Sequence, residues 1–209
     1  MSPLPVGVIL AGGRGRRFGG VDKSFLELRQ RPLIEHVIAR IAPQVGELLI
    51  NTNSADGRYR LYGAGLCGDA PRTAPATGPL IGLTSAIAAL ENRGDQHSCL
   101  LSVPVDTPFL PGDLVSRLST ALAVTEAPIA FAATTERDHP IVALWGPKSR
   151  HPLRQLFDCQ PNISLHAVMA ALDAERVVFV HRPTDPFFNI NSPQDLWTAP
   201  HQRPTAAPF

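Results

Sequence analysis

Short apolar runs alternate with amphipathic segments along most of the chain. Residues 6–10 form a compact β-branched run, which is typical of a strand buried on both faces. From Pro32 the apolar residues recur at helical spacing, and proline is favoured at the first helical position. The two patterns predict strands at 6–10, 47–51, 98–105, 129–133, 141–145 and 176–180, a weak strand before Gly68, and helices at 32–42, 55–62, 80–94, 113–124 and 164–172.

Strands that alternate with helices in this way favour a parallel sheet wound in both directions. We therefore predict an α/β fold of the Rossmann-like, doubly wound type, with a mostly parallel sheet and helices on both faces. Residues 1–196 are expected to form a single domain. The remainder, 197–209, is expected to be a disordered tail, because 200–209 contains three prolines and no apolar period.

Composition narrows the classes of function. The chain has 209 residues, 44% of them hydrophobic, which is enough for a sizeable core. Its formal net charge of +1 argues against nucleic-acid binding through a general positive field. Any anionic partner must therefore bind at a local cluster of positive groups. Cys67, Cys99 and Cys159 lack metal-ligand spacing and are expected to be buried thiols in a reducing compartment. No apolar run approaches the ~18–20 residues of a membrane helix, and the N-terminus lacks a basic signal region, so we expect a soluble cytoplasmic protein without membrane partners.

The segment LAGGRGRRFGGVDKS, at 10–24, is unsuited to a helix or a strand. Five glycines and three arginines fall within residues 12–20, where glycine weakens both regular elements. Glycine also lets backbone N–H groups turn toward a ligand that approaches closely, and such loops hold phosphate at helix N-termini. With positive charge on Arg14, Arg16, Arg17 and Lys23, the segment predicts a polyphosphate site.

Three phosphate-binding motifs compete for this segment. A Walker A loop fails because Lys23 and Ser24 follow Asp22 where that motif requires glycine. A dinucleotide fingerprint beginning at Gly13 fails because its third glycine would come at Gly19, one residue too late. The expected ribose-binding acid is also replaced by asparagine at the end of the strand at 47–51. The remaining option is the loop of nucleotidyltransferases.

At this point the sequence resembles a known family. LAGGRGRRFGGVDKS is similar to the signature of the molybdenum cofactor guanylyltransferases (MobA type). Further segments resemble that family in the same order: NTN at 51–53, GD at 68–69, GPLIGL at 78–83, VPVDTPFLP at 103–111, ERDHP at 136–140 and FFNINSPQDL at 187–196. The resemblance covers roughly residues 6–196.

The resemblance implies a fold like that of the nucleotide-diphospho-sugar transferases, with a nucleotide-binding half near 1–106 and a pterin-substrate half near 107–196. It implies Mg²⁺-dependent transfer of GMP from GTP to the phosphate of molybdopterin cofactor, with release of pyrophosphate. It also suggests molybdenum-insertion proteins and recipient molybdoenzymes as partners.

Asp106 is the candidate metal ligand. It follows the strand at 98–105, and in a doubly wound sheet of order 3-2-1-4 that strand lies beside the strand at 6–10. The carboxylate would then face the glycine-rich segment across a crevice, and an acid opposite a phosphate site suggests Mg²⁺. Capping of the following turn is the alternative, since Asp before Thr-Pro is common turn chemistry.

Cationic and amide side chains complete the expected catalytic set. Lys23 and Arg17 are candidates for stabilising charge on the transferring phosphoryl group, whereas solvated surface charge is the simpler reading of Arg14 and Arg16. Asn189 and Asn191 are expected at the same sheet edge. The resemblance places their motif near the metal and the pterin substrate, and a polar strand end with a helix cap is the alternative.

Guanine selection is expected from Asn51 and Asp69. Guanine presents adjacent N1–H and N2–H donors, which amide and carboxylate oxygens can accept. Turn capping is the alternative for Asp69. Backbone groups of the segment would assist with base and phosphates, at Leu10, Ala11, Gly12, Gly13 and Gly15.

The second half is less informative about the acceptor substrate. Within residues 160–168, where the related enzymes carry more arginine, His166 is the one possible cation. His139 could approach the second substrate, although a histidine beside a proline turn is more often exposed.

Two other functions remain open at this stage. One is the same fold acting on CTP or on a sugar phosphate. The other is a non-catalytic module that binds GTP or carries the cofactor.

Overall fold

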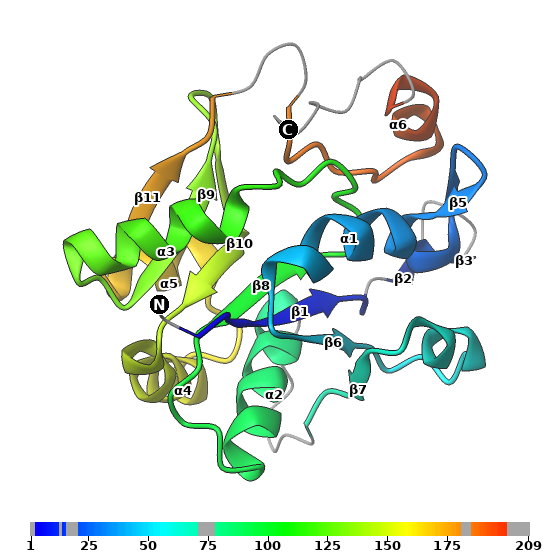
Figure 1. Cartoon of the computed structure of the whole chain (residues 1–209). Coiled ribbons are helices and arrows are strands. Elements are labelled where there is room, and N and C mark those ends of the chain that lie inside the picture. Colours follow the sequence, from blue (N-terminus) through cyan, green and yellow to red (C-terminus); the bar gives the residue numbers. More distant parts are fainter. Residues whose placement is uncertain (1–2, 13, 16–20, 71–77, 181–184, 200–209) are drawn as a thin grey trace.

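A seven-stranded sheet forms the centre of the molecule (Figure 1). The computed structural model describes residues 3–12, 14–15, 21–70, 78–180 and 185–199. The strand order is β11-β9-β10-β8-β1-β6-β7. In chain order the strands are β1 (Val6–Leu10), β6 (Glu47–Asn51), β7 (Gly65–Cys67), β8 (Leu100–Pro104), β9 (Ile129–Ala133), β10 (Asp138–Trp145) and β11 (Glu175–Val178).

The sheet is mostly parallel, as predicted. β7, β6, β1 and β8 run parallel in the expected order 3-2-1-4, and β11 is parallel to β9. β10 is antiparallel to both of its neighbours. The reason is the short connection from β9, closed by a Thr134 N–H donating to the Arg137 carbonyl, because a parallel return needs a crossover of a dozen or more residues.

Helices cover both faces of the sheet, which confirms the predicted doubly wound fold (Figure 1). Both faces need cover because neighbouring side chains of a strand point to opposite faces of the sheet. Val8 and Ile9 of β1 accordingly belong to two different core clusters. The cluster around Ile9 holds α1 (Leu33–Ile41) and α3 (Leu114–Thr125). The cluster around Val8 holds α2 (Pro79–Asn92), α4 (Arg150–Cys159) and α5 (Leu165–Ala171).

Several local predictions needed correction. The sequence pattern did not predict α4, whose apolar residues have helical spacing but whose first turn contains a proline, a tolerated position. The stretch expected as a helix at 55–62 is a 3₁₀ helix, Gly57–Tyr62. The strand expected at 141–145 begins earlier than predicted, because β10 starts at Asp138. Cys159 is exposed and the other two cysteines are partly buried, so the expected buried thiols are wrong, although all three are free.

Short elements lie outside the sheet. The glycine-rich segment, expected to form neither helix nor strand, contains a two-residue ladder between β2 (Arg14–Gly15) and β3 (Val21–Asp22). β4 (Glu27–Leu28) and β5 (Arg31–Pro32) form a small hairpin, and 3₁₀ turns cover Lys23–Phe25, Ala42–Gln44 and Pro147–Ser149. α6 (Pro193–Thr198) begins after a capping box on Ser192. Part of the expected disordered tail is wrong, because α6 continues to Thr198 and its C-cap residue Ala199 is buried; the rest of the tail, 200–209, lies outside the described residues.

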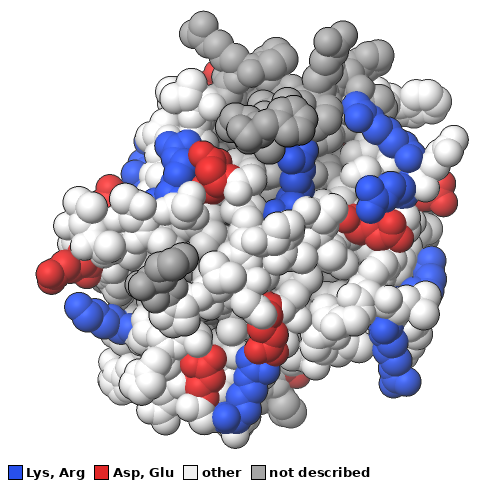
Figure 2. Space-filling view, viewed as in Figure 1, with Lys and Arg blue, Asp and Glu red and all other residues white. Residues whose placement is uncertain are grey.

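The face of the molecule in Figure 2 shows no dominant charge of one sign among its described residues. On the face in Figure 2, acidic and basic side chains are interspersed. Among the described residues, no helix is both long and apolar enough to cross a membrane.

Candidate active site

The carboxyl ends of β6, β1 and β8 meet at one edge of the sheet. Leu10 is paired with Asn51, the last residue of β6. The ladder continues past the strands, since the Ala11 N–H donates to the Asn51 carbonyl (2.8 Å) and the Val105 N–H to the Leu10 carbonyl (3.2 Å). The glycine-rich segment and Asp106 therefore leave the sheet from adjacent strands.

A cavity of about 350 Å³ lies at this edge. Its size falls within the range of small-molecule sites. Four residues predicted as nucleotide contacts line it: Leu10, Gly12, Asn51 and Asp69. The N–H of Ala11, also predicted as a contact, is already used in the sheet ladder. The remaining lining residues come from the start of α2 and from β8 and β10: Gly78, Pro79, Ile81, Gly82, Pro104 and Ile141.

Two asparagines hold the carboxylate of Asp69. The nearly buried Asn51 donates from Nδ2 to Asp69 Oδ1 (3.2 Å) and to the Cys67 carbonyl (3.3 Å). Asn53 donates from Nδ2 to Asp69 Oδ2 (2.5 Å) and accepts the Asp69 N–H at Oδ1 (2.8 Å). The structure therefore brings Asn51 and Asp69 together as the sequence predicted. Asn53 was missed as a site residue, although its place two residues after a strand end, in NTN, was a usable signal.

Gly82 on α2 lies against the Asn51 amide. The amide nitrogen is turned toward two acceptors, the Cys67 carbonyl and the Asp69 carboxylate, so the amide oxygen is directed toward Gly82. A Cβ at position 82 would overlap Asn51 Oδ1 and lie 2.9 Å from its Cγ. The helix therefore needs glycine here for the amide to keep this orientation.

Lys23, Asp106 and Asn191 meet although they are far apart in the sequence. The Lys23 ammonium donates to Asp106 Oδ2 (2.8 Å) and to Asn191 Oδ1 (2.6 Å). The lysine and aspartate side chains are each 15% exposed, so the ion pair is largely shielded from water. The other carboxylate oxygen, Asp106 Oδ1, is buried and has no hydrogen-bond partner among the described residues. This arrangement differs from turn capping, in which the carboxylate would accept a backbone N–H.

The unsatisfied Asp106 oxygen fits an oxygen-seeking cation. Among the described residues, no three His, Cys, Asp or Glu side chains are grouped so that they could hold a metal together. Mg²⁺ is commonly bound by only one or two carboxylates, with the remaining ligands supplied by phosphates and water. The donor set present is therefore suited to a metal that arrives with a phosphate substrate.

A second cavity of about 580 Å³ adjoins the first, since Ile141 lines both. Asn189 and Asn191 line it, and Asn189 Oδ1 accepts a hydrogen bond from the Thr107 hydroxyl (2.6 Å). The nine residues that complete the lining come from the β9–β10 connection, β10 and the region around α6: Glu136, Arg137, Asp138, His139, Pro140, Ile141, Asp185, Phe188 and Asp195.

The second cavity corrects two expectations about cations. His139 is 7% exposed, with its ring 4.7 Å from that of Phe187, so the expected exposure is wrong. His166 is exposed on α5 and does not line the cavity. Arg137, which does line it, was missed despite its place in the ERDHP motif.

Some predicted residues are not tested by this geometry. Gly13, Arg16 and Arg17 lie outside the described residues. Gly15 lies in β2, whose backbone pairs with Val21 of β3.

Comparison with known proteins identifies the family of the chain. Residues 7–177 match the family model of the MobA-like NTP transferase domain. The chain is 36% identical over 194 residues to the molybdenum cofactor guanylyltransferase of Rhodopseudomonas palustris (strain BisB5), covering 93% of this chain and 91% of that protein. It is 38% identical over 193 residues to the molybdenum cofactor guanylyltransferase of Shewanella pealeana, covering 90% and 89% of the two chains.

Among solved structures, the chain is similar to molybdopterin-guanine dinucleotide biosynthesis protein A from Archaeoglobus fulgidus. The TM-score is 0.68 at 21% identity, covering 93% of this chain and 96% of that one. The likeness supports the nucleotide-diphospho-sugar-transferase-like fold. The chain therefore belongs to the MobA-like NTP transferase family and is a nucleotidyltransferase.

Proposed function

We propose that this enzyme transfers GMP from GTP to the terminal phosphate of molybdopterin cofactor and releases pyrophosphate, with Mg²⁺ as the metal. The observation that carries the proposal is the contact of Lys23 with Asp106 and Asn191, because Asn191 lines the larger cavity, which adjoins the smaller one at Ile141. The guanylyltransferase activity named for the relatives from Rhodopseudomonas and Shewanella supports it.

The smaller cavity is assigned to the guanine base. The Asp69 carboxylate and the Asn51 amide oxygen are neighbouring acceptors, which suits the adjacent N1–H and N2–H donors of guanine. Cytosine presents one exocyclic amine beside acceptors and would leave one of these oxygens unpaired. Asn53 acts as a positioning residue, because its two hydrogen bonds restrict rotation of the Asp69 carboxylate.

Lys23 is assigned to the phosphates. Its ammonium has three hydrogens, and Asp106 and Asn191 accept two of them, which leaves one for a substrate phosphate. Nucleotidyl transfer depends on positioning and charge stabilisation, and a cation held on two partners loses little freedom when the substrate binds. Arg17 is retained as a second candidate cation, and Gly12, Gly13 and Gly15 as the backbone that approaches the triphosphate.

Asp106 is assigned to the metal through its buried Oδ1. When bound, Mg²⁺ would supply Lewis-acid neutralisation of phosphate charge. The carboxylate also fixes the Lys23 ammonium through Oδ2, so the lysine stays beside Asn191, which lines the larger cavity.

The larger cavity is assigned to the pterin substrate. Its described lining is polar and combines Arg137, His139 and Asn189 with four carboxylates, which suits a polar ring system with several hydrogen-bond donors. The proposal thus divides the domain into a nucleotide half near 1–106 and an acceptor half near 107–196. Three free cysteines are consistent with a cytoplasmic location, where molybdenum-insertion proteins and recipient molybdoenzymes would be its partners.

Pyrophosphate release tests the proposal directly. The purified chain is assayed with GTP, CTP, UTP and ATP, each with and without molybdopterin cofactor, and with Mg²⁺ or with EDTA. We expect release only with GTP, the cofactor and Mg²⁺ together. Preference for CTP, or turnover with a sugar phosphate as acceptor, would assign the chain to a different transferase, and GTP binding without release would indicate a non-catalytic module.

Substitution of Asp106 tests its assignment as the metal ligand, and Asp113 provides a matched control. Asp106→Asn is expected to lower kcat about 10²–10³-fold while GTP still protects the protein against heat. Asp113→Asn, an exposed carboxylate before α3 whose side chain makes no capping bond, should leave kcat unchanged. Normal turnover by a folded Asp106→Asn variant would refute the assignment.

A further inference from the structure

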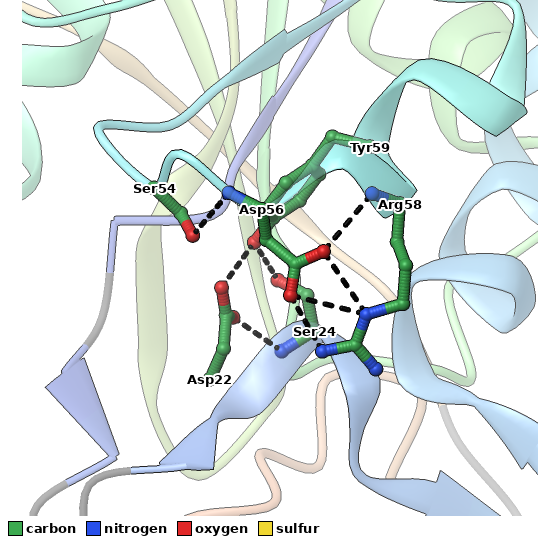
Figure 3. Close-up of polar contacts among 6 residues, drawn as sticks. All are labelled: Asp22, Ser24, Ser54, Asp56, Arg58 and Tyr59. Carbon is green, nitrogen blue, oxygen red and sulfur yellow. Dashed lines mark hydrogen bonds and ion pairs between the residues drawn. The ribbon is translucent and has the colours of Figure 1, made fainter.

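The short segment that carries Lys23 is held from one side by the 3₁₀ helix Gly57–Tyr62. Asp22 caps the turn Lys23–Phe25, because its Oδ1 accepts the Ser24 N–H at 3.0 Å. The Tyr59 hydroxyl lies 2.8 Å from Asp22 Oδ2 and 2.7 Å from Ser24 Oγ (Figure 3). Two residues that flank Lys23 in the sequence therefore meet one phenol group from a distant part of the chain.

The chemistry of these contacts defines the direction of each bond. A phenol has one proton, so Tyr59 donates it to the Asp22 carboxylate and accepts the Ser24 hydroxyl proton. Tyr59 and Ser24 are fully buried, which leaves no water to replace either bond. Burial also raises the pKa of the Tyr59 phenol, so the hydroxyl keeps its proton at neutral pH.

Aromatic and ionic contacts hold the same two segments together beside the hydroxyl. The rings of Phe25 and Tyr59 lie 4.9 Å apart, and the Arg58 guanidinium lies 3.6 Å from the Phe25 ring centroid. Arg58 is paired with Asp56, which in turn caps the 3₁₀ helix at the Arg58 N–H (Figure 3). The phenol bonds therefore act on a segment whose packing is already defined.

This network connects the two parts of the site. The 3₁₀ helix follows β6, whose last residue, Asn51, lines the cavity assigned to the base, and Asn53, between β6 and the helix, holds Asp69 of the same cavity. On its other side the helix holds the turn from which the Lys23 ammonium reaches Asp106 and Asn191. The lysine backbone is thus located by residues that do not line either cavity.

We infer that Tyr59, acting through Asp22 and Ser24, is a positioning residue that sets the place of the Lys23 ammonium for phosphoryl transfer. The catalytic part of this inference rests on the proposed function. The structural part, that the phenol hydroxyl restrains Lys23, does not.

Tyr59→Phe keeps the ring and removes the hydroxyl. Because small displacements of a catalytic group can strongly reduce rate, we expect kcat for pyrophosphate release to fall about tenfold, with KM for GTP changed less than about twofold. Tyr62→Phe removes a phenol hydroxyl from the same 3₁₀ helix and is the matched control, expected to keep wild-type kcat. Circular dichroism and thermal melting establish that both variants fold.

A second readout does not require turnover. The sequence contains two lysines, the shielded Lys23 and the exposed Lys148, which serves as an internal reference. Limited acetylation with an activated ester, followed by peptide mass spectrometry, gives the ratio of the two modification rates. In Tyr59→Phe we expect the Lys23 to Lys148 ratio to rise roughly threefold or more, because local opening exposes the amine, and Tyr62→Phe to leave it unchanged.

The inference requires that Tyr59→Phe both lowers kcat and raises the Lys23 to Lys148 labelling ratio. If folded Tyr59→Phe retains the wild-type labelling ratio, or retains wild-type kcat in an active enzyme, or if Tyr62→Phe shows the same changes, the inference is overturned. If the wild-type chain releases no pyrophosphate with any nucleotide, the proposed function fails, and the labelling ratio alone then decides whether Tyr59 positions Lys23.

Discussion

Replacing Gly82 by alanine would place a methyl group against the amide proposed to select the base. The added Cβ would overlap Asn51 Oδ1, lie 2.9 Å from Asn51 Cγ and 3.1 Å from Leu10 Cδ2. Asn51 is 2% exposed and held by the Cys67 carbonyl and the Asp69 carboxylate, so its amide can turn away from the methyl group only by breaking these hydrogen bonds. The substitution therefore forces the amide away from its present orientation.

The magnitude follows from the contacts affected. Overpacking typically costs about 1–3 kcal/mol, and loss of each Asn51 hydrogen bond costs roughly 1 kcal/mol. The higher helix propensity of alanine offsets about 1 kcal/mol. A net loss of roughly 2–4 kcal/mol is smaller than a typical stability of about 5–15 kcal/mol, so the variant should fold. One lost acceptor for the base, worth about 1.4 kcal/mol, weakens GTP binding about tenfold.

Calorimetric titration with GTP and with inosine triphosphate measures this effect. Inosine lacks the exocyclic amine of guanine, so the ratio of the two Kd values reports recognition of that group. Gly82→Ala should raise the Kd for GTP about tenfold and bring the ratio closer to one. Gly112→Ala is the matched control, because a Cβ there meets nothing within 4 Å. A folded Gly82→Ala protein with wild-type Kd and wild-type ratio would show that the Asn51 amide does not read the base.

Two further predictions concern stability. The indole N–H of the buried Trp145 donates to Ser102 Oγ at 2.8 Å. Ser102→Ala removes this acceptor and should lower the free energy of unfolding by about 1–3 kcal/mol, measured by urea titration. An unchanged midpoint of unfolding would contradict the prediction. Burial raises the pKa of Asp195, but hydrogen bonds from the Asn191 and Ser192 backbone and the Ser192 hydroxyl outweigh it, so the net pKa lies below its ordinary value of 3.8. A carboxyl with a lowered folded-state pKa contributes stability above the unfolded pKa and loses it as the pH falls through the folded one. Asp195→Asn should therefore lower the free energy of unfolding by about 1 kcal/mol at pH 7, measured by chemical denaturation. The difference in this free energy between wild type and variant should become smaller below pH 3.8. A difference that stays constant down to pH 2 would count against this role of the charge.

Local patterns predicted the central elements well. β1, β6 and β9 coincide with their predicted ranges, because short apolar runs between polar turns leave few alternatives to a buried strand. The helix α4 was missed because it contains two arginines, a histidine and a proline and only a few apolar residues, so its helical pattern is weak. The helix is stabilised when Leu153 and Phe157 pack in the core cluster on one face of the sheet.

The sequence by itself determined the doubly wound fold, the family, and the candidate residues Lys23, Asp106, Asn51 and Asp69. The fold and the candidate residues follow from residue types near predictable strands, and the family follows from the resemblance of the whole set of motifs. Which side chains contact one another was decided only by the tertiary structure. Lys23 is 168 residues from Asn191, and Tyr59 reaches Asp22 from across 37 residues. Such contacts depend on how separate elements pack and on which polar groups remain to be satisfied after burial, and neither has a local signature in the chain.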